Sequence, residues 1–162
     1  MSEGVNVNQT SGLTVRQHER EGIEVPIEFV VCEAHATQVR FSPSSGALTP
    51  HVIRGEAIDI SSGGMGLRSR QFVPRMCEGT VRVFAVVPDS KNADGSPVLE
   101  LMFEQMVKVR RVTLVGREPV YSLGVAFINH SEDLDRRITT LFDRIQDGGR
   151  RAMSAGVGGN RA

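Results

Sequence analysis

A carboxylate, a hydroxyl and two glycines follow one another closely in the middle of the chain. Asp59 and Ser61 stand two residues apart at the end of an apolar stretch, and Gly63 and Gly64 come soon after them. Side chains two apart on a strand point to the same face, so both can meet one ligand, while glycines let a ligand approach the backbone. The alternative is a tight turn, in which glycine supplies positive φ and Asp or Ser caps the turn. The spacing alone leaves both interpretations open.

Two arginines form the second group that could bind a ligand. Arg16 and Arg20 lie four residues apart in a polar stretch just before the first apolar run. The guanidinium fork binds phosphate groups and base edges through paired hydrogen bonds and stacks on rings. Arginine pairs on solvated segments are also common without any ligand. With Asp59 and Ser61, the two arginines predict a local site for an anionic ligand.

The charges of the chain balance, because Lys and Arg together number 19 and so do Asp and Glu. No global field therefore draws the protein to nucleic acid or to an anionic membrane. A barrel for single-stranded nucleic acid needs stacking aromatic side chains, and this chain has no Trp and one Tyr. No stretch reaches the length needed to cross a bilayer. We expect no DNA or RNA partner and no membrane insertion.

Motifs of catalysis and metal binding are missing from the sequence. There is no G-x-x-x-x-G-K-[ST], no H-E-x-x-H and no G-x-S-x-G, and the four histidines lack ligand spacing. Cys32 and Cys77 stand far apart, which indicates buried, reduced thiols. The first residues lack the pattern of a secretory signal. The sequence predicts a cytoplasmic protein that is not an enzyme and has no metal and no cofactor.

Apolar residues alternate with polar ones along several runs, which indicates half-buried antiparallel strands. One of these runs, residues 98–115, is long enough for two strands or for one long bent strand. Residues 88–97 carry Asp-Gly and two prolines and are typical of a hairpin connection. Within residues 33–52, which look like an insertion, residues 42–50 form a polar loop. The expected strands lie in residues 25–31, 52–60, 81–87, 98–115 and 121–127.

A single apolar stripe at helical spacing predicts a helix over residues 132–146. Ser131 is a suitable N-cap, and Gly148 with Gly149 suits the helix end. The fold class is therefore mainly β, with five to seven strands followed by a helix. A small barrel closed or plugged by the helix is the economical architecture, and an open two-layer sheet is the alternative. The stripe consists of Leu134, Ile138, Leu141, Phe142 and Ile145.

The two groups of candidate residues together resemble the PilZ domain, a bacterial receptor domain for cyclic di-GMP. Arg16 and Arg20 match R-x-x-x-R, and Asp59, Ser61 and Gly64 match [DN]-x-S-x-x-G in the same order. The resemblance covers roughly residues 15 to 146. It implies a six-stranded antiparallel β-barrel with a C-terminal α-helix. The implied domain occupies residues 15–147, between a flexible segment at 1–14 and a disordered Gly-rich tail at 148–162.

The resemblance also implies a ligand and a role for each residue. Arg16 and Arg20 would contact the guanine O6 and N7 edges, the phosphates and the ring faces of cyclic di-GMP. Asp59 would accept hydrogen bonds from guanine N1 and N2. Ser61 would hydrogen-bond the ligand or the loop, and Gly64 would keep the turn open.

The implied mechanism is a switch in which the ligand folds the N-terminal segment across the barrel and a new surface signals to a downstream protein. Motility, exopolysaccharide and biofilm control are the processes that this resemblance suggests. Val15 stands where many relatives carry a further arginine, which leaves open whether one ligand or a stacked pair binds. The oligomeric state is expected to be monomer or homodimer. The alternative is an interaction module of the same fold that binds no nucleotide.

Overall fold

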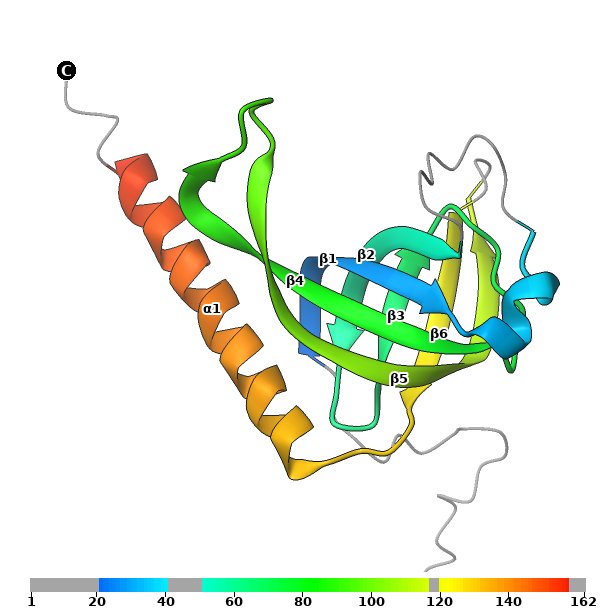
Figure 1. Ribbon diagram of the computed structural model, residues 1–162. Coiled ribbons are helices and arrows are strands. Elements are labelled where there is room, and N and C mark those ends of the chain that lie inside the picture. Colours follow the sequence, from blue (N-terminus) through cyan, green and yellow to red (C-terminus); the bar gives the residue numbers. More distant parts are fainter. Residues whose placement is uncertain (1–20, 41–50, 117–119, 158–162) are drawn as a thin grey trace, which may run out of the picture.

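Six antiparallel strands close into one ring in the computed structural model, which describes residues 21–40, 51–116 and 120–157. The order around the ring is β1-β2-β3-β6-β5-β4, so both neighbours of every strand are strands of the same sheet (Figure 1). The predicted six-stranded antiparallel architecture is confirmed. The strands are β1 Glu21–Val31, β2 Val52–Ile60, β3 Gly64–Ser69, β4 Glu78–Lys91, β5 Pro97–Val115 and β6 Val120–Phe127.

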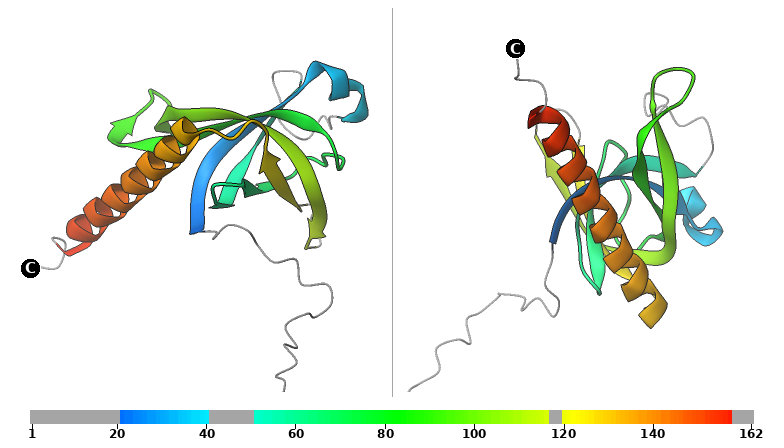
Figure 2. Two further views of the ribbon diagram at one scale, coloured as in Figure 1. Left: turned by 90° about the horizontal axis from the view of Figure 1, so that it is seen from below. Right: turned by 90° about the vertical axis from the view of Figure 1, so that its left-hand side faces the viewer.

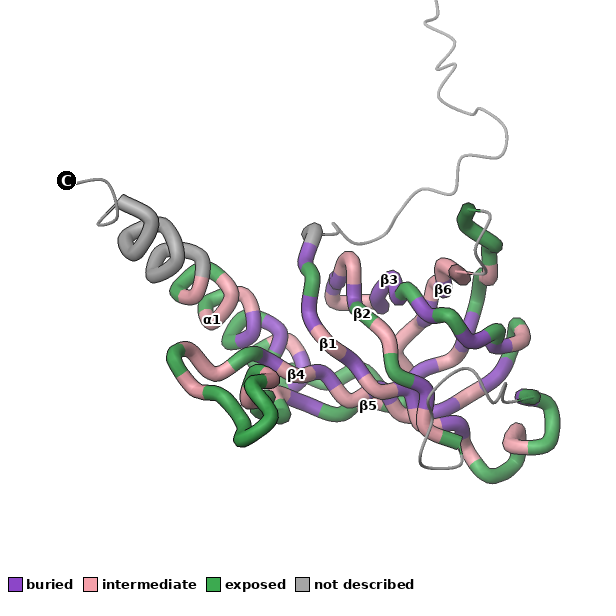
Figure 3. Tube along the Cα trace, turned by 90° about the horizontal axis from the view of Figure 1, so that it is seen from above, coloured by how far each residue is buried: buried purple, intermediate pink, exposed green. Residues whose placement is uncertain are grey.

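The core fills the inside of the ring because apolar side chains alternate along the strands. In β1, Val25, Ile27, Phe29 and Val31 are all buried, as the period of two predicts. Figure 3 shows buried residues alternating with more exposed ones along the strands. Phe103 of β5 is 1% exposed and is among the largest side chains of this core. One hydrophobic cluster therefore joins the strands on the inside of the ring.

Strands β4 and β5 form a long hairpin that extends beyond the ring (Figure 1). The run 98–115 is one continuous strand and not two, with register irregularities where it follows the curvature of the sheet. The predicted turn is present but shorter than expected, because β4 continues through Pro88 to Lys91. Gly95 takes the positive φ that this turn requires, at 84°.

Helix α1, Glu132–Val157, packs against β4 and β5 and runs away from the ring (Figure 2). Ser131 Oγ accepts a hydrogen bond from the backbone N–H of Leu134 at 3.2 Å, which confirms the predicted N-cap. The stripe residues Leu134, Ile138 and Leu141 are buried in the same hydrophobic core as the strand residues.

The predicted helix end was wrong, because α1 continues through Gly148 and Gly149 to Val157. Each glycine costs only about 1 kcal/mol relative to alanine in a helix, and Arg, Ala and Met in the following residues favour helix. The helix thus enters the segment predicted as a disordered tail, while residues 158–162 lie outside the described residues.

The predicted insertion at residues 33–52 begins with a short 3-10 helix, Glu33–Gln38. Val39 follows it and is buried in the core. The Gln71 side-chain amide donates a hydrogen bond to the Arg40 carbonyl at 2.6 Å, which attaches this connection to the sheet. Residues 41–50, which contain the whole predicted polar loop of residues 42–50, lie outside the described residues.

The two cysteines differ in their surroundings. Cys77 is fully buried, as predicted, whereas Cys32 is half-buried. Burial raises the pKa of the Cys77 thiol to about 11, with smaller contributions from Cys32 and Glu78. The thiol form is therefore the form that the folded protein favours.

This raised pKa predicts a loss of stability in alkaline solution. The unfolded Cys77 thiol ionises near its ordinary pKa of 9.0, whereas the folded thiol keeps its proton up to about pH 11. The free energy of unfolding should consequently fall between pH 9 and pH 11. Denaturant unfolding at pH 8 and pH 10.5 measures the effect, and a Cys77→Ala variant should show a smaller decline. An equal decline in both proteins would contradict the prediction.

Candidate functional site

The candidate site residues of the central motif lie at the β2–β3 hairpin. Asp59 is the second-last residue of β2, Gly64 is the first of β3, and Ser61 and Gly63 lie in the connecting turn. The same end of the sheet holds the start of β1, where Gly22 faces Asp59 in the ladder. Arg16 and Arg20 lie outside the described residues.

An extra residue in β2 turns Asp59 to the outer face of the sheet. Ala57 faces Leu67 and Asp59 faces Gly66, so Ile58 is the residue added by this bulge. Ala57 and Ile60 are buried on the inside of the ring. Without the extra residue, strict alternation would point Asp59 inward with Ala57. Because of this bulge, the Asp59 carboxylate points outward and not into the core.

The carboxylate of Asp59 is held over Gly66. Asp59 Oδ1 accepts a hydrogen bond from the Gly66 backbone N–H at 2.8 Å. A Cβ atom on Gly66 would lie 2.8 Å from the same oxygen and 3.0 Å from the carboxylate carbon. Only glycine therefore leaves room for the carboxylate in this position. Our sequence prediction did not include Gly66, although its place between the apolar Met65 and Leu67 is a signal of an outward-facing position.

Ser61 does not share the outer face with Asp59, contrary to the geometric expectation from the sequence. The side chain is only 7% exposed. Its Oγ donates to the Gly64 carbonyl at 3.3 Å and accepts from the Gly63 N–H at 3.3 Å, while its backbone N–H donates to the Gly64 carbonyl at 2.9 Å. β2 ends at Ile60, so the strand alternation no longer applies. Of the two roles expected for the hydroxyl, this geometry favours the bond to the loop; a ligand contact stays a prediction.

The two motif glycines hold the hairpin against β6. The Gly63 carbonyl accepts a hydrogen bond from the Phe127 N–H at 3.0 Å. A Cβ atom on Gly64 would collide with the Val125 carbonyl oxygen and lie 3.2 Å from the Ala126 Cα. Among the described glycines, Gly95 and Gly116 have positive φ, whereas Gly63 and Gly64 do not. Gly64 is thus required by the close approach of two strands, and not by an unusual turn conformation.

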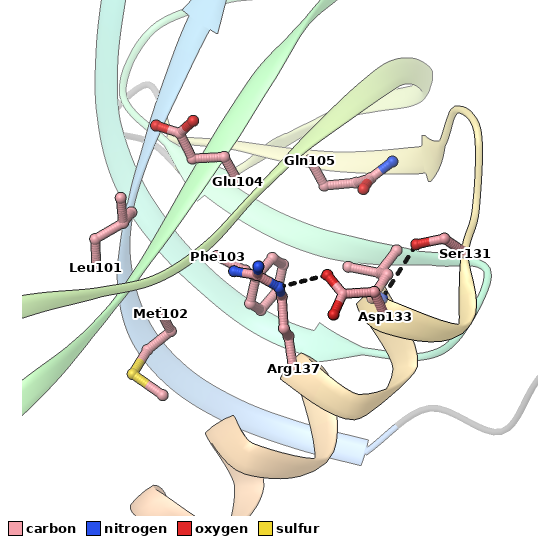
Figure 4. Close-up of a pocket in the computed structure, with 9 residues that line it drawn as sticks. Leu101, Met102, Phe103, Glu104, Gln105, Ser131, Asp133 and Arg137 are labelled. Carbon is pink, nitrogen blue, oxygen red and sulfur yellow. Dashed lines mark hydrogen bonds and ion pairs between the residues drawn. The ribbon is translucent and has the colours of Figure 1, made fainter.

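A separate hollow of about 350 Å³ lies between β5 and the first turns of α1 (Figure 4). Phe103 and Gln105 line it from β5, and Asp133 and Arg137 form an ion pair of 2.7 Å on its helical side. Of the predicted site residues that the structure describes, none lines this hollow. It is therefore not part of the candidate site.

Metal-ligand clusters and membrane-spanning helices are both absent from the described residues. No group of three or more His, Cys, Asp or Glu side chains in this part of the chain could hold a metal ion. Within the same ranges, no helix has both the length and the apolar character needed to span a bilayer.

Comparisons with known proteins identify the fold. No protein-family model matches the chain, and no curated protein matches its sequence. The structure is similar to that of Escherichia coli YcgR in complex with c-di-GMP, at 12% identity and a TM-score of 0.51 over 87% of this chain and 50% of that chain. It is also similar to the PilZ domain of YcgR with c-di-GMP, at 14% identity and a TM-score of 0.50 over 86% of this chain and 98% of that chain.

The chain has a PilZ-like fold, as the sequence motifs predicted. The fold is the six-stranded ring with its C-terminal helix, and the chain spans about half the length of the YcgR chain that it matches. At identities of 12% and 14%, the similarity concerns the fold. The motif residues and their geometry must therefore support any assignment of function.

Proposed function

We propose that this protein is a cyclic di-GMP receptor that changes conformation on binding and signals to a partner protein. One observation carries the proposal: the Asp59 carboxylate lies on the outer face of the sheet, beside the start of β1. The N-terminal arginines are joined to that same strand. The similar fold of the Escherichia coli YcgR PilZ domain, whose structure was solved with c-di-GMP, adds support.

Chain connectivity allows both arginines to reach Asp59. Arg20 directly precedes Glu21, and Glu21 faces Ile60, the neighbour of Asp59. Arg16 is five residues from Glu21, so an extended chain spans at most about 18 Å between them. Two guanidinium groups and one carboxylate can therefore meet around a single small ligand.

This set of side chains matches the hydrogen-bonding groups of cyclic di-GMP. Guanine presents acceptors at O6 and N7, which the arginine fork contacts in pairs, and hydrogens at N1 and N2, which need an acceptor such as Asp59. Each of the two phosphates carries a negative charge that a guanidinium neutralises. No general base or nucleophile is needed for binding, and the proposal includes no catalysis.

Ordering of the segment around Arg16 and Arg20 is the proposed signal. Bound phosphates and bases would hold this segment against the outer face, and the new surface would dock on a downstream protein. The proposed setting is bacterial second-messenger control of motility, exopolysaccharide or biofilm formation in the cytoplasm.

Isothermal titration tests the proposal directly. The full chain should bind cyclic di-GMP with measurable heat, and Arg16→Ala or Arg20→Ala should abolish that heat. GTP serves as the control ligand, because it carries the same base without the cyclic arrangement of two nucleotides. No heat with cyclic di-GMP from the unaltered, folded protein would refute the receptor function.

The second candidate function is an interaction module that binds no nucleotide. Exposed apolar side chains on the β4–β5 hairpin favour a protein partner, because Val86 and Leu99 face one another and are 49% and 43% exposed. Leu101 is 45% exposed on the same hairpin. A folded protein without titration heat would favour this second function.

A further inference from the structure

The outward row that contains Asp59 continues across the sheet to a third arginine. Gly66 faces Asp59 on one side and Gly124 of β6 on the other, and Gly124 in turn faces Arg111 of β5. Met65, Leu67, Leu123 and Val125, the neighbours of the two glycines along their strands, are buried. The glycine positions therefore point outward.

A second bulge places Arg111 on this outer face. Val109 faces Val125 and Arg111 faces Gly124, so Arg110 is the residue added in β5. Val109 is fully buried, whereas Arg111 is exposed. Strict alternation would point Arg111 inward with Val109. Asp59 and Arg111, the two charged residues of this row, are thus each turned outward by an extra residue in their own strand.

The Arg111 side chain extends over Gly124 and has no partner among the described residues. Its Nε lies 3.8 Å from the position of a Cβ atom on Gly124. It makes no ion pair or side-chain hydrogen bond within the described ranges, in contrast to Arg82, which binds Glu104 at 2.7 Å. An outward guanidinium without a carboxylate partner keeps its hydrogen-bond donors available for a ligand.

The carboxylate and this guanidinium lie over two glycines that face one another in the sheet. Directly opposed residues in an antiparallel pair have Cα atoms about 4.5 to 5.5 Å apart. The Asp59 carboxylate lies over Gly66 and the Arg111 side chain over its partner Gly124. An acceptor and a set of donors are therefore separated by about one strand spacing.

This separation suits the two hydrogen-bonding edges of one guanine. N1 and N2 carry hydrogens for a carboxylate, while O6 and N7 accept from a guanidinium fork. Adenine presents an amino group in place of O6, which would oppose the donors of the arginine. We propose that Arg111 is a further ligand-binding residue, which contacts the O6 and N7 edge of a guanine held by Asp59. The inference rests on the proposed function, since it concerns a ligand of that same site.

A cycle of two ligands and two proteins tests the contact. The ligands are cyclic di-GMP and its 7-deazaguanine analogue, in which a carbon replaces the N7 acceptor. Arg111→Ala should weaken cyclic di-GMP binding about tenfold or more. When the analogue replaces cyclic di-GMP, the affinity of Arg111→Ala should fall by a smaller factor than the affinity of the unaltered protein. Arg111→Lys keeps the charge without the fork and should recover only part of the affinity.

Controls separate this contact from general charge and from misfolding. Arg54→Ala removes an exposed arginine of β2, five residues from Asp59 along the strand, and should change affinity less than twofold. Equal unfolding midpoints for the variants and the unaltered protein establish that all of them fold. Two results would overturn the Arg111 contact while leaving the receptor function intact. One is unchanged affinity of Arg111→Ala for cyclic di-GMP. The other is that the analogue weakens binding by the same factor in Arg111→Ala as in the unaltered protein. Failure of the unaltered protein to bind cyclic di-GMP would instead overturn the receptor function, and the contact with it.

Discussion

Replacing Gly64 by alanine is expected to destabilise the protein by about 3 kcal/mol or more. The added Cβ would collide with the Val125 carbonyl oxygen, and the Ala126 Cα lies 3.2 Å away. Both atoms belong to the backbone of β6, so no side chain can rotate to make room. Relief requires β3 and β6 to separate at the residues where they pair, which weakens the closure of the ring.

Denaturant unfolding measures this change, and Gly148→Ala is the matched control. Gly148 lies in α1, and a Cβ atom there would have no neighbour within 4 Å. The same substitution should therefore stabilise the helix by up to about 1 kcal/mol, since alanine favours helix over glycine. Opposite signs for the two variants are expected. Equal stability of Gly64→Ala and the unaltered protein would show that the close approach to β6 is not the reason for this glycine.

Replacing Asp59 by alanine is expected to weaken cyclic di-GMP binding about 100-fold. The carboxylate is the described side chain that offers acceptors to guanine N1 and N2, and hydrogen bonds to a charged group contribute about 1.5 to 3 kcal/mol each. The cost to folding should be smaller, about 1 kcal/mol, because the Gly66 N–H loses its acceptor. Titration and thermal unfolding on the same samples separate the two effects.

Gly66→Ala tests the position of this carboxylate without removing it. The new Cβ would lie 2.8 Å from Asp59 Oδ1, so the carboxylate must move away from its place over β3. Binding should fall nearly as much as in Asp59→Ala. The control is Glu56→Ala, which removes an exposed carboxylate three residues earlier in β2 and should leave the affinity within twofold. Normal binding by Gly66→Ala would mean that the observed carboxylate position is not the one that binds ligand.

Local sequence patterns were sufficient to predict most elements of the fold. The strand-like apolar run of residues 52–60 coincides with β2, and the helical stripe from Leu134 to Ile145 lies on the buried side of α1. The N-cap at Ser131 was also predicted, because capping depends on neighbours three residues away. The glycines at 148 and 149 misled the prediction of the helix end, since their cost is modest and the residues beyond favour helix.

The sequence by itself therefore determined five of the six strands, the helix and the stretch that carries the candidate site, β3 being the strand that was not expected. Tertiary structure decided which way the side chains of that stretch point. The spacing of Asp59 and Ser61 predicted that both side chains share one face of a strand. A bulge at Ile58 turns Asp59 outward, whereas the Ser61 hydroxyl is hydrogen-bonded within the hairpin turn. Arg111 reaches the same face through the bulge at Arg110. The physical reason is that a bulge is defined by two strands together: one extra residue opposite an unbroken partner shifts every later side chain to the other face.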